Sequence, residues 1–507
     1  MSIATEIGRI AEAKADIKRA INAKGGTLVN EKLSAYAAAI DDLLPEEFGN
    51  RVRFIDFDGT VLKTQYVADG ESATPPANPS HTGLVFQGWN TSLDDVLSHR
   101  DIGAAYTTAS NSAEFDVWMV VRTGYTVTFY PHLESGTLTV DWGDGTTDTI
   151  TGTGRKTVSY SYADYGDYTV KIKVSNGGRW YIPENFCNGS NGNFYLVRAR
   201  IADAWKIGNN AFQYCYGLRY CTIGNSVTAI GEYAFYECRA LQSVVLPPSL
   251  ESLGRAAFYY CYALMRVVFA DALTEIPESL CNCCYTLDGV TFPDGVTAIR
   301  DQAFSSCYSL REIGFPESLT DIGEDAFAEN RALREIKFPS TLIRLKESAF
   351  RNCYSLEEAI LPDSITSLGS YVFTNCHSLK HITFPNDLTR IPSGICAHCY
   401  SLEEINLPDH ATEIGDEAFY ECLRVRSVDI PKTVAILRSG CFRYCRSMEN
   451  YHFHTNTPPT LNSSNAFGEI SESCRIWVPV SVDRTVLTAY KTAANWSNYA
   501  DYIYERN

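Results

Sequence analysis

The chain has 507 residues, of which 45% are apolar and 20% charged, a composition typical of a folding chain and not of a mainly disordered one. Its 43 basic and 60 acidic side chains give a net charge of −17, which repels phosphate backbones and argues against nucleic-acid binding. No stretch approaches the roughly 18 consecutive apolar residues of a bilayer-spanning helix, so we expect no membrane insertion. We also expect no secretory signal, because the N-terminus lacks a basic start followed by an apolar run.

Isoleucines near the N-terminus recur at alternating steps of four and three, which is the spacing of a heptad seam. The seam consists of Ile3, Ile7, Ile10, Ile17 and Ile21, with Lys14 at the remaining position. Isoleucine at both seam positions favours trimers or tetramers over dimers, so we predict a helical oligomerisation and attachment region in residues 1–48 and a homotrimer. The alternative is a helix that packs on its own chain, because so short a seam is marginal alone.

Residues 49–110 form the next predicted domain, a module and a linker, and the segments FIDFDGT and LVFQGW lie within its residues 51–89. The residues that carry a family resemblance are Phe54, Asp58-Gly59, Val61-Leu62, Gly70, Pro76, Pro79, Gly83, Phe86 and Gly88-Trp89. They resemble the Listeria–Bacteroides (internalin B-type) repeat, which implies a small β-grasp-like spacer. Asp56 to Thr60 is also similar to the signature of haloacid dehalogenase phosphatases, in which two aspartates work beside Mg²⁺. The alternating strands and helices of that fold do not follow, so Asp58-Gly59 is interpreted as a hairpin turn.

Residues 111–180 contain the tight-turn sequence WGDG between alternating strands. The motif consists of Trp142-Gly143-Asp144-Gly145, Tyr162, Gly166, Tyr168 and Val170. This pattern resembles the PKD domain, which implies an Ig-like sandwich acting as a spacer or binding module. Asp141, Asp144 and Asp148 surround the turn and could hold Ca²⁺, but their spacing is not that of an EF-hand loop, and turn geometry alone explains them.

A 23-residue period dominates the remainder of the chain. The anchors of its IGxxAF pattern are Ile207, Ile230, Leu253, Ile276, Ile299, Ile322, Leu345, Leu368, Ile391, Ile414 and Leu437, which makes eleven repeats. Phe usually stands at position +5 from the anchor, Cys at +8 and Leu at +11, and apolar residues at +14 and +16 alternate as a short strand before Pro. Such a period predicts a parallel-sheet solenoid, with the exposed strand positions on one continuous face.

The pattern AFxxCxSLxxIxxPxSLTxIG resembles the BspA-like leucine-rich repeat family, which implies a curved solenoid used for adhesion and recognition, without catalysis. We therefore place the solenoid at residues 181–460 and a C-terminal cap at 461–507. In this cap we expect a strand at Ile476–Val478 and an amphipathic helix that carries Val482, Val486 and Tyr490. The predicted fold class is thus multidomain: a helical segment, β-grasp-like and PKD-like β domains, the solenoid and its cap.

Ten of the eleven repeats place Cys at +8, and Asn330 is the exception. We interpret the column as a stack of small buried thiols, some close enough to oxidise. CxxC pairs at Cys281/Cys284 and Cys396/Cys399 arise where Cys also replaces the +5 Phe, and they lie five turns apart, about 24 Å at ~4.8 Å per turn. One metal ion cannot bridge that distance, so we expect no metal site and no cofactor.

Position +9 departs from the serine that is frequent in such repeats. The candidate ligand-binding residues are Tyr216, Arg239, Tyr262, Tyr285, Tyr308, Arg331, Tyr354, His377 and Tyr400. Exposed Tyr and Arg offer rigid contact area and hydrogen bonds at low entropic cost, and aromatic rings stack on sugars. The alternative is a structural ladder in which these side chains pack on one another.

We conclude from the sequence that the chain is a non-enzymatic receptor-binding protein. The domain order resembles bacteriophage and prophage tail proteins, which implies a tail fibre or tail-tip protein of the virion. Its N-terminal region would bind phage tail or baseplate proteins, and its solenoid would bind a host cell-surface glycan or protein. The alternatives are a BspA-like adhesin on a bacterial cell surface and a tail-borne polysaccharide depolymerase.

Overall fold

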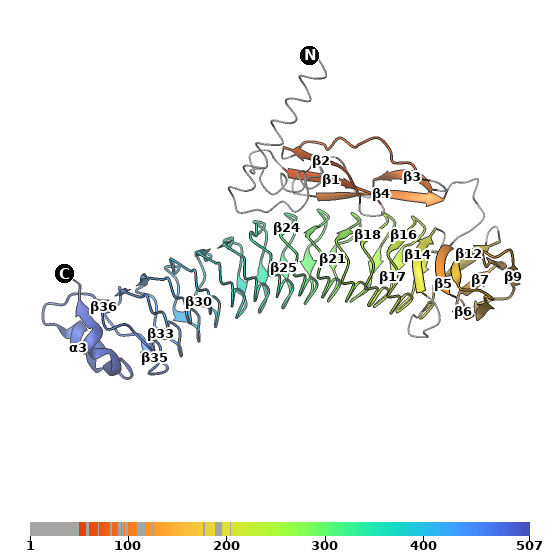
Figure 1. Ribbon diagram of the computed structural model, residues 1–507. Helices are drawn as coiled ribbons and strands as arrows, with labels where there is room; N and C mark the ends of the chain where they lie inside the picture. The colour runs from red at the N-terminus through yellow and green to blue at the C-terminus, as the bar shows by residue number, and fades with distance from the viewer. Residues whose placement is uncertain are drawn as a thin grey trace, which may run out of the picture.

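The computed structural model describes residues 50–56, 60–68, 70–81, 84–89, 93, 96, 100–108, 117–123, 126–175, 178–187, 195–202 and 204–506. A small sheet, a β-sandwich and a long curved solenoid follow one another along the chain, and a short helical cap closes the C-terminal end (Figure 1). The predicted parallel-sheet solenoid is confirmed. Within the described part of the chain, no helix has the length and apolar character needed to cross a membrane.

The first unit, which we call the N-terminal module, is a mixed four-stranded sheet in the order β2-β1-β4-β3. Its strands are β1 (Asn50–Ile55), β2 (Val61–Val67), β3 (Leu84–Trp89) and β4 (Arg100–Thr108). Val52, Phe54 and Ile102 are fully buried in its core. β1 and β2 pair antiparallel, as a hairpin at Asp58-Gly59 requires, although that turn itself lies outside the described residues.

The second unit is a β-sandwich that packs its strands around Trp142 and Trp180. Its strands are β5 (Val117–Thr123), β6 (Thr126–Phe129), β7 (His132–Ser135), β8 (Leu138–Asp141), β9 (Thr147–Ile150), β10 (Gly154–Arg155), β11 (Val158–Ser161), β12 (Gly166–Val174) and β13 (Arg179–Tyr181). The WGDG turn joins β8 to β9, and its carboxylates are engaged within it. Asp141 accepts a hydrogen bond from the Gly143 amide, and Asp148 accepts one from the Trp142 indole.

One sheet runs without a break from the sandwich into the solenoid. β14 (Tyr195–Ile201) pairs antiparallel with β5 of the sandwich and parallel with β16 of the first solenoid turn. The apolar interior is also continuous, because Phe129, Phe186 and Phe212 contact one another across the junction. The sandwich therefore closes the N-terminal end of the solenoid, which would otherwise expose its interior.

The solenoid has two rows of short parallel strands, and partners in adjacent turns are typically 23 residues apart, as Ile207 and Ile230 are. The first row, at the anchors, consists of β15 (Lys206–Ile207), β17 (Ala229–Ile230), β19 (Ser252–Leu253), β21 (Glu275–Ile276), β23 (Ala298–Ile299), β25 (Asp321–Ile322), β26 (Arg344–Leu345), β28 (Ser367–Leu368), β30 (Arg390–Ile391), β31 (Glu413–Ile414), β33 (Ile436–Leu437) and β35 (Thr460–Leu461). The anchors thus pair as strands themselves, which the sequence analysis did not predict.

The second row begins at about position +13 of most repeats, where the alternating pattern predicts a strand, and the repeats anchored at Ile322 and Ile391 have no strand there. It consists of β16 (Tyr220–Ile223), β18 (Ser243–Val245), β20 (Arg266–Val268), β22 (Gly289–Thr291), β24 (Glu312–Gly314), β27 (Glu358–Ile360), β29 (His381–Thr383), β32 (Ser427–Ile430), β34 (Asn450–Phe453), β36 (Arg475–Val478) and β37 (Ile503–Glu505). Position +14 points into the core, as at Val244 and Ile382, so +13 and +15 point outward. We call the outward surface formed by these two positions, together with position +12 that precedes them, the strand face.

The solenoid interior consists of stacked columns. Rings at +5 are parallel with their centroids 5.2 Å apart for Phe212 and Phe235, and 5.3 Å apart for Phe327 and Phe350. The +8 thiols are buried, and each donates to the carbonyl of a +5 residue one repeat earlier, as Cys353 does to Phe327. All 17 cysteines are unpaired. Burial raises the pKa of the Cys261 and Cys376 thiols, so these two groups are weak nucleophiles.

Each turn of the solenoid bends at residues with left-handed backbone conformation. Non-glycine residues adopt a positive φ at +3, as at Ala256, and at +7, as at Ser306, through most of the array. Such a conformation costs roughly 1–2 kcal/mol for a residue with a Cβ. The bends close each turn and direct backbone amides to the next one, as the Phe235 amide donates to the Ala257 carbonyl at 2.8 Å.

The C-terminal end is covered by α3 (Thr485–Thr492) and the 3₁₀ helix η4 (Trp496–Tyr502). Tyr490 and Trp496 pack with Phe453 of the last turns, and the Trp496 indole donates to the Pro459 carbonyl. The expected helix is present, but Val482 precedes it and is fully exposed, so its predicted place on the apolar side of that helix is wrong.

Candidate interaction surface

The N-terminal module lies along the strand face of the first solenoid turns (Figure 1). Ile55 at the end of β1 forms a buried cluster with Val245 and Val268, which occupy position +15 in consecutive repeats. Gly103 on β4 fits against the same valines, and a Cβ there would lie 2.4 Å from a methyl group of Val245. The glycine is required by this close approach and not by its backbone conformation.

Charged side chains surround this apolar contact. Arg51 on β1 binds both carboxylate oxygens of Glu312 on β24 at 2.6 Å. Arg53 forms two hydrogen bonds with Asp101 inside the module, at 2.7 and 2.9 Å, and the same carboxylate lies 3.6 Å from Arg266 on β20. The ions form a chain that alternates in sign across the interface, which is what allows them to be buried.

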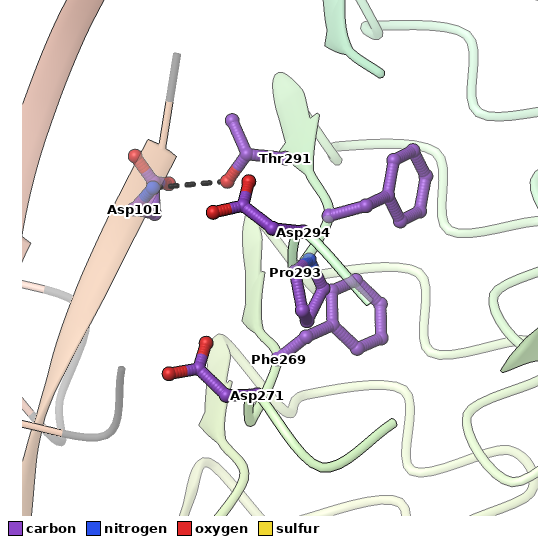
Figure 2. A pocket seen from close by; sticks show the side chains of 7 residues that line it. Asp101, Phe269, Asp271, Thr291, Pro293 and Asp294 are labelled. Carbon is purple, nitrogen blue, oxygen red and sulfur yellow. Dashed lines mark hydrogen bonds between the residues drawn. The ribbon is translucent and has the colours of Figure 1, made fainter. Parts of the chain in front are cut away.

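Asp101 is the hub of this interface. Its backbone amide donates to the Thr291 hydroxyl at 2.9 Å, which fixes β4 against β22 beside a cavity of about 20 Å³ (Figure 2). Burial alone would raise the pKa of Asp101, but the Arg53 and Arg266 guanidinium groups hold it below its usual range. Burial would likewise raise the pKa of Glu312, but its hydrogen bond and ion pair with Arg51 lower that pKa. Both carboxylates are therefore ionised while the module is docked.

The module divides the strand face into a covered and an open half. At position +15 Val245 is 8% exposed and Val268 1%, whereas Ile360 in the same column is 56% exposed. The expectation of one continuous exposed strand face is therefore wrong for the first turns. The module folds back on the solenoid because its own β1 and β4 carry the complementary groups, and it does not extend away as a simple spacer (Figure 1).

The open half has a mixed surface with somewhat more acidic than basic side chains. Its outward residues are Arg334, Glu335, Lys337, Glu357, Glu358, Ile360, Lys380, His381, Thr383, Glu403, Glu404, Asn406, Arg426, Ser427 and Asp429. Ion pairs join neighbouring turns, such as Lys380 with Glu357 at 2.6 Å. A hollow of about 470 Å³ lies at the C-terminal part of this half, between Glu403, Asp429 and His454. The surface thus offers charged and hydrogen-bonding groups around one large exposed apolar side chain.

The nine candidate residues at +9 form one uninterrupted stack, which we call the aromatic column. Tyr285 lies between Tyr262 and Tyr308, with ring centroids 4.8 and 4.7 Å away and nearly parallel planes. The guanidinium groups of the two arginines continue the stack over flanking rings, as Arg331 does 4.4 Å above Tyr308. The remaining contacts join Tyr216 to Arg239, Arg239 to Tyr262, Arg331 to Tyr354, Tyr354 to His377 and His377 to Tyr400.

The spacing of the aromatic column follows from the solenoid itself. Parallel strands lie ~4.8 Å apart, so flat side chains in one column stack face to face. The ring faces between Tyr262 and Tyr400 are occupied by neighbouring side chains, which leaves only ring edges and hydroxyl groups for a ligand. A sugar ring therefore cannot stack on those faces. Contact between a ligand and the exposed ring edges stays a prediction.

The predicted oligomerisation residues Ile3, Ile7, Ile10, Ile17 and Ile21 lie outside the described residues. In the described part of the chain, no group of three or more His, Cys, Asp or Glu side chains is arranged to hold a metal ion. Asp56 pairs with His81 at 2.7 Å, and residues 57–59 of the phosphatase-like segment lie outside the described residues.

Asp101, Arg51 and Glu312 are interface residues that the sequence analysis missed. The one signal in the sequence was at +15, where Val245 and Val268 interrupt a largely polar column. Two adjacent valines at positions expected to face solvent indicate a covered surface.

Comparison with solved structures finds similar leucine-rich repeat proteins. A leucine-rich repeat protein from Bacteroides ovatus is 22% identical with a TM-score of 0.52, and the match covers 69% of this chain and 90% of that chain. A leucine rich cell surface protein from Faecalibacterium prausnitzii is 27% identical, with a TM-score of 0.33 and coverage of 55% and 93%. The pneumococcal vaccine antigen PcpA is 18% identical, with a TM-score of 0.41 and coverage of 64% and 83%. The first of these shows the shared fold.

No curated protein has significant sequence similarity to the chain. The family model described as "BspA type Leucine rich repeat region (6 copies)" matches at residues 205–333, 297–423, 323–449 and 389–489, which together span more than half of the 507 residues. These matches coincide with the two rows of strands and the columns between them. The chain belongs to the BspA-type leucine-rich repeat family.

Proposed function

We propose that this protein is a non-enzymatic recognition protein that binds a cell-surface protein or glycan through the open half of its strand face. The observation that carries the proposal is the contrast along one column, in which Val245 and Val268 are covered while Ile360 is exposed beside charged turns. A broad surface with charges, hydrogen-bonding groups and an apolar centre suits binding to a macromolecule. The eleven repeats predicted from the sequence form the binding unit.

The aromatic column is the second part of the proposed binding surface. It lies a few residues before the strand face in every turn, and its tyrosine hydroxyl groups are the parts that its stacking leaves open. The two small β domains, which resemble a Listeria–Bacteroides repeat and a PKD domain, would position the solenoid. A bound partner would contact open turns of the strand face and the edges of the column together.

The setting we propose is a bacteriophage tail fibre or tail-tip protein that attaches by its N-terminal region as a homotrimer. The second candidate is a bacterial cell-surface adhesin. The family membership supports keeping this second candidate, and one solved protein that the chain resembles is described as a cell surface protein.

Binding of the labelled full chain to a panel of intact bacterial cells tests the proposed function. We expect Glu404→Lys combined with Lys380→Glu to abolish binding, because both side chains lie on the open half. The matched control is Lys206→Glu, a charge change on the first row of strands. Trypsin-treated and periodate-treated cells separate a protein receptor from a glycan. Equal binding by the double variant and the wild type would refute a role for the open half.

Replacing Tyr285 by Phe separates the two interpretations of the aromatic column. Phe keeps the stacking with Tyr262 and Tyr308 and removes only the hydroxyl group. If the column edges contact the partner, cell binding weakens while thermal stability is retained. Unchanged binding would assign the column to structure alone.

Light scattering on the full chain and on a form lacking residues 1–48 tests the setting. A trimer that becomes a monomer on truncation supports the tail-fibre candidate. A monomer in both forms removes the argument from the isoleucine seam and favours the adhesin.

A further inference from the structure

We propose that the N-terminal module is a releasable cover, and that the strand face beneath it, from Ser243 to Gly314, is a second recognition surface. This inference rests on the proposed function, because it extends binding from the open to the covered half. The occupant of the covered half is a segment of this chain, residues 50–108. We propose that this segment dissociates from the strand face while it remains joined to the rest of the chain.

The location of the module supports a masking role. It contacts the outward positions of β18, β20, β22 and β24, the same columns that are open farther along the solenoid. Val245 and Val268 beneath it correspond to Ile360 in the open half. The covered turns therefore have an apolar centre flanked by charges, Arg266 and Glu312, as the open turns do. Removal of the module would roughly double the strand face available to a partner.

The composition of the interface favours release. Its apolar centre is a single small cluster of Ile55, Val245 and Val268, and ionic and hydrogen-bonded contacts surround that cluster. Buried ion pairs add little net stability, because the cost of removing water from both charges offsets their attraction. They do fix orientation, since a misplaced charge would stay unpaired. Contacts between domains of this polar kind are those that open and close.

Reversal of the charge at Glu312 tests the proposal without disturbing the solenoid. Glu312→Arg places a third cation beside Arg51 and Arg53, and position +13 accepts arginine, since Arg266 occupies it elsewhere. The matched control is Glu358→Arg, the same change at the same position of an open turn. The double variant Glu312→Arg with Arg51→Glu restores an opposite-charge pair and should restore docking.

Hydroxyl-radical footprinting of the full chain provides the readout. In Glu312→Arg we expect Ile55, Val245 and Val268 to lose their protection and to oxidise at rates approaching that of Ile360. The wild type, Glu358→Arg and the double variant should keep them protected. A second releasing variant is Gly103→Leu, whose side chain collides with Val245. Small-angle X-ray scattering should show a larger radius of gyration for both releasing variants.

Two results would overturn the proposal. Continued protection of Val268 in both releasing variants would show a permanent domain contact. Loss of protection accompanied by a lower thermal midpoint of the solenoid would show unfolding and not release.

Cell binding gives the functional arm of the test. Releasing variants should bind cells more strongly than the wild type and than the double variant Glu312→Arg with Arg51→Glu, and equal binding by all these forms would overturn the role of the covered half as a recognition surface. Failure of every form, including the wild type, to bind any cell would count against the proposed function. The footprinting result decides separately whether the module opens.

Discussion

At the residue scale, a column of the solenoid can require a specific chemical group as well as an apolar side chain. Position +8 needs a small donor, because a +5 carbonyl of the preceding turn points at it inside the core. Cys353 meets this need with its thiol, and Asn330 meets it with its amide, which donates to the Phe304 and Phe327 carbonyls at 3.1 and 3.0 Å. The exception at Asn330 is therefore a chemical equivalent of the cysteines around it.

Substitution of Asn330 tests that requirement. Asn330→Ala leaves two buried carbonyl groups without this donor, and we expect a loss of about 1–3 kcal/mol in the free energy of unfolding. Asn330→Cys restores the thiol donor and removes an amide oxygen that accepts no hydrogen bond from the described residues, so its stability should stay near that of the wild type. Urea denaturation under reducing conditions measures both. Equal losses in the two variants would contradict the donor explanation.

At the element scale, the 23-residue turn is set by two bends as well as by its strands. The period, the alternation at +14 and +16, and the Phe and Cys columns were sufficient to predict the second row of strands and the solenoid. The anchor strands could not be foreseen, because two residues are too few to show an alternating pattern. The bends were also missed, since residues as different as Ala256, Tyr371 and Glu417 adopt a positive φ at +3.

Two glycines at position +3 allow the cost of a bend to be measured. Gly440 has φ 62°, and a Cβ added there would meet nothing closer than 3.4 Å, so Gly440→Ala should cost about 1 kcal/mol from backbone conformation alone. Gly394 has φ 58°, but an added Cβ would meet the Tyr371 ring at 2.2 Å. We expect Gly394→Ala to lower the free energy of unfolding by about a further 1–3 kcal/mol. Thermal or urea denaturation that ranks the two variants in the opposite order would contradict this explanation.

At the scale of the whole molecule, the contact between the module and the solenoid was beyond sequence analysis. Its hydrogen-bonded partners are far apart in the sequence, 190 residues for Asp101 and Thr291 and 261 residues for Arg51 and Glu312, and no period relates them. Only the valines at 245 and 268 hinted that something covers those turns. The nine residues of the aromatic column were predicted as a group, and the structure brings all of them together, whereas their role in binding depends on experiment.

Docking of the module should depend on pH. Arg51 and Arg53 on β1, Asp101 on β4, Arg266 on β20, Asp288 beside it and Glu312 on β24 face one another at the interface. The pKa values of Asp101 and Glu312 are lowered in the folded protein, so their contribution to docking is fully present above the ordinary carboxylate pKa of about 4 and is lost as the pH falls through the lowered values.

Footprinting at decreasing pH measures this dependence. We expect Ile55 and Val268 to stay protected near neutral pH and to become accessible in strong acid before the solenoid melts. The double variant Asp101→Asn with Glu312→Gln should show weaker protection already at neutral pH. Protection that is constant until global unfolding would contradict the ionic explanation.

The two rows of strands also determine how the molecule carries mechanical load. Their hydrogen bonds run along the solenoid axis, so tension along that axis loads the bonds between adjacent turns and peels turns away one after another. Each detached turn of 23 residues lengthens the chain by roughly 80 Å when fully extended. The N-terminal module spans β18 to β24 and ties those turns together, so peeling starts in the turns it does not cover. Under flow, extension of the uncovered turns would limit the force that reaches a bound partner.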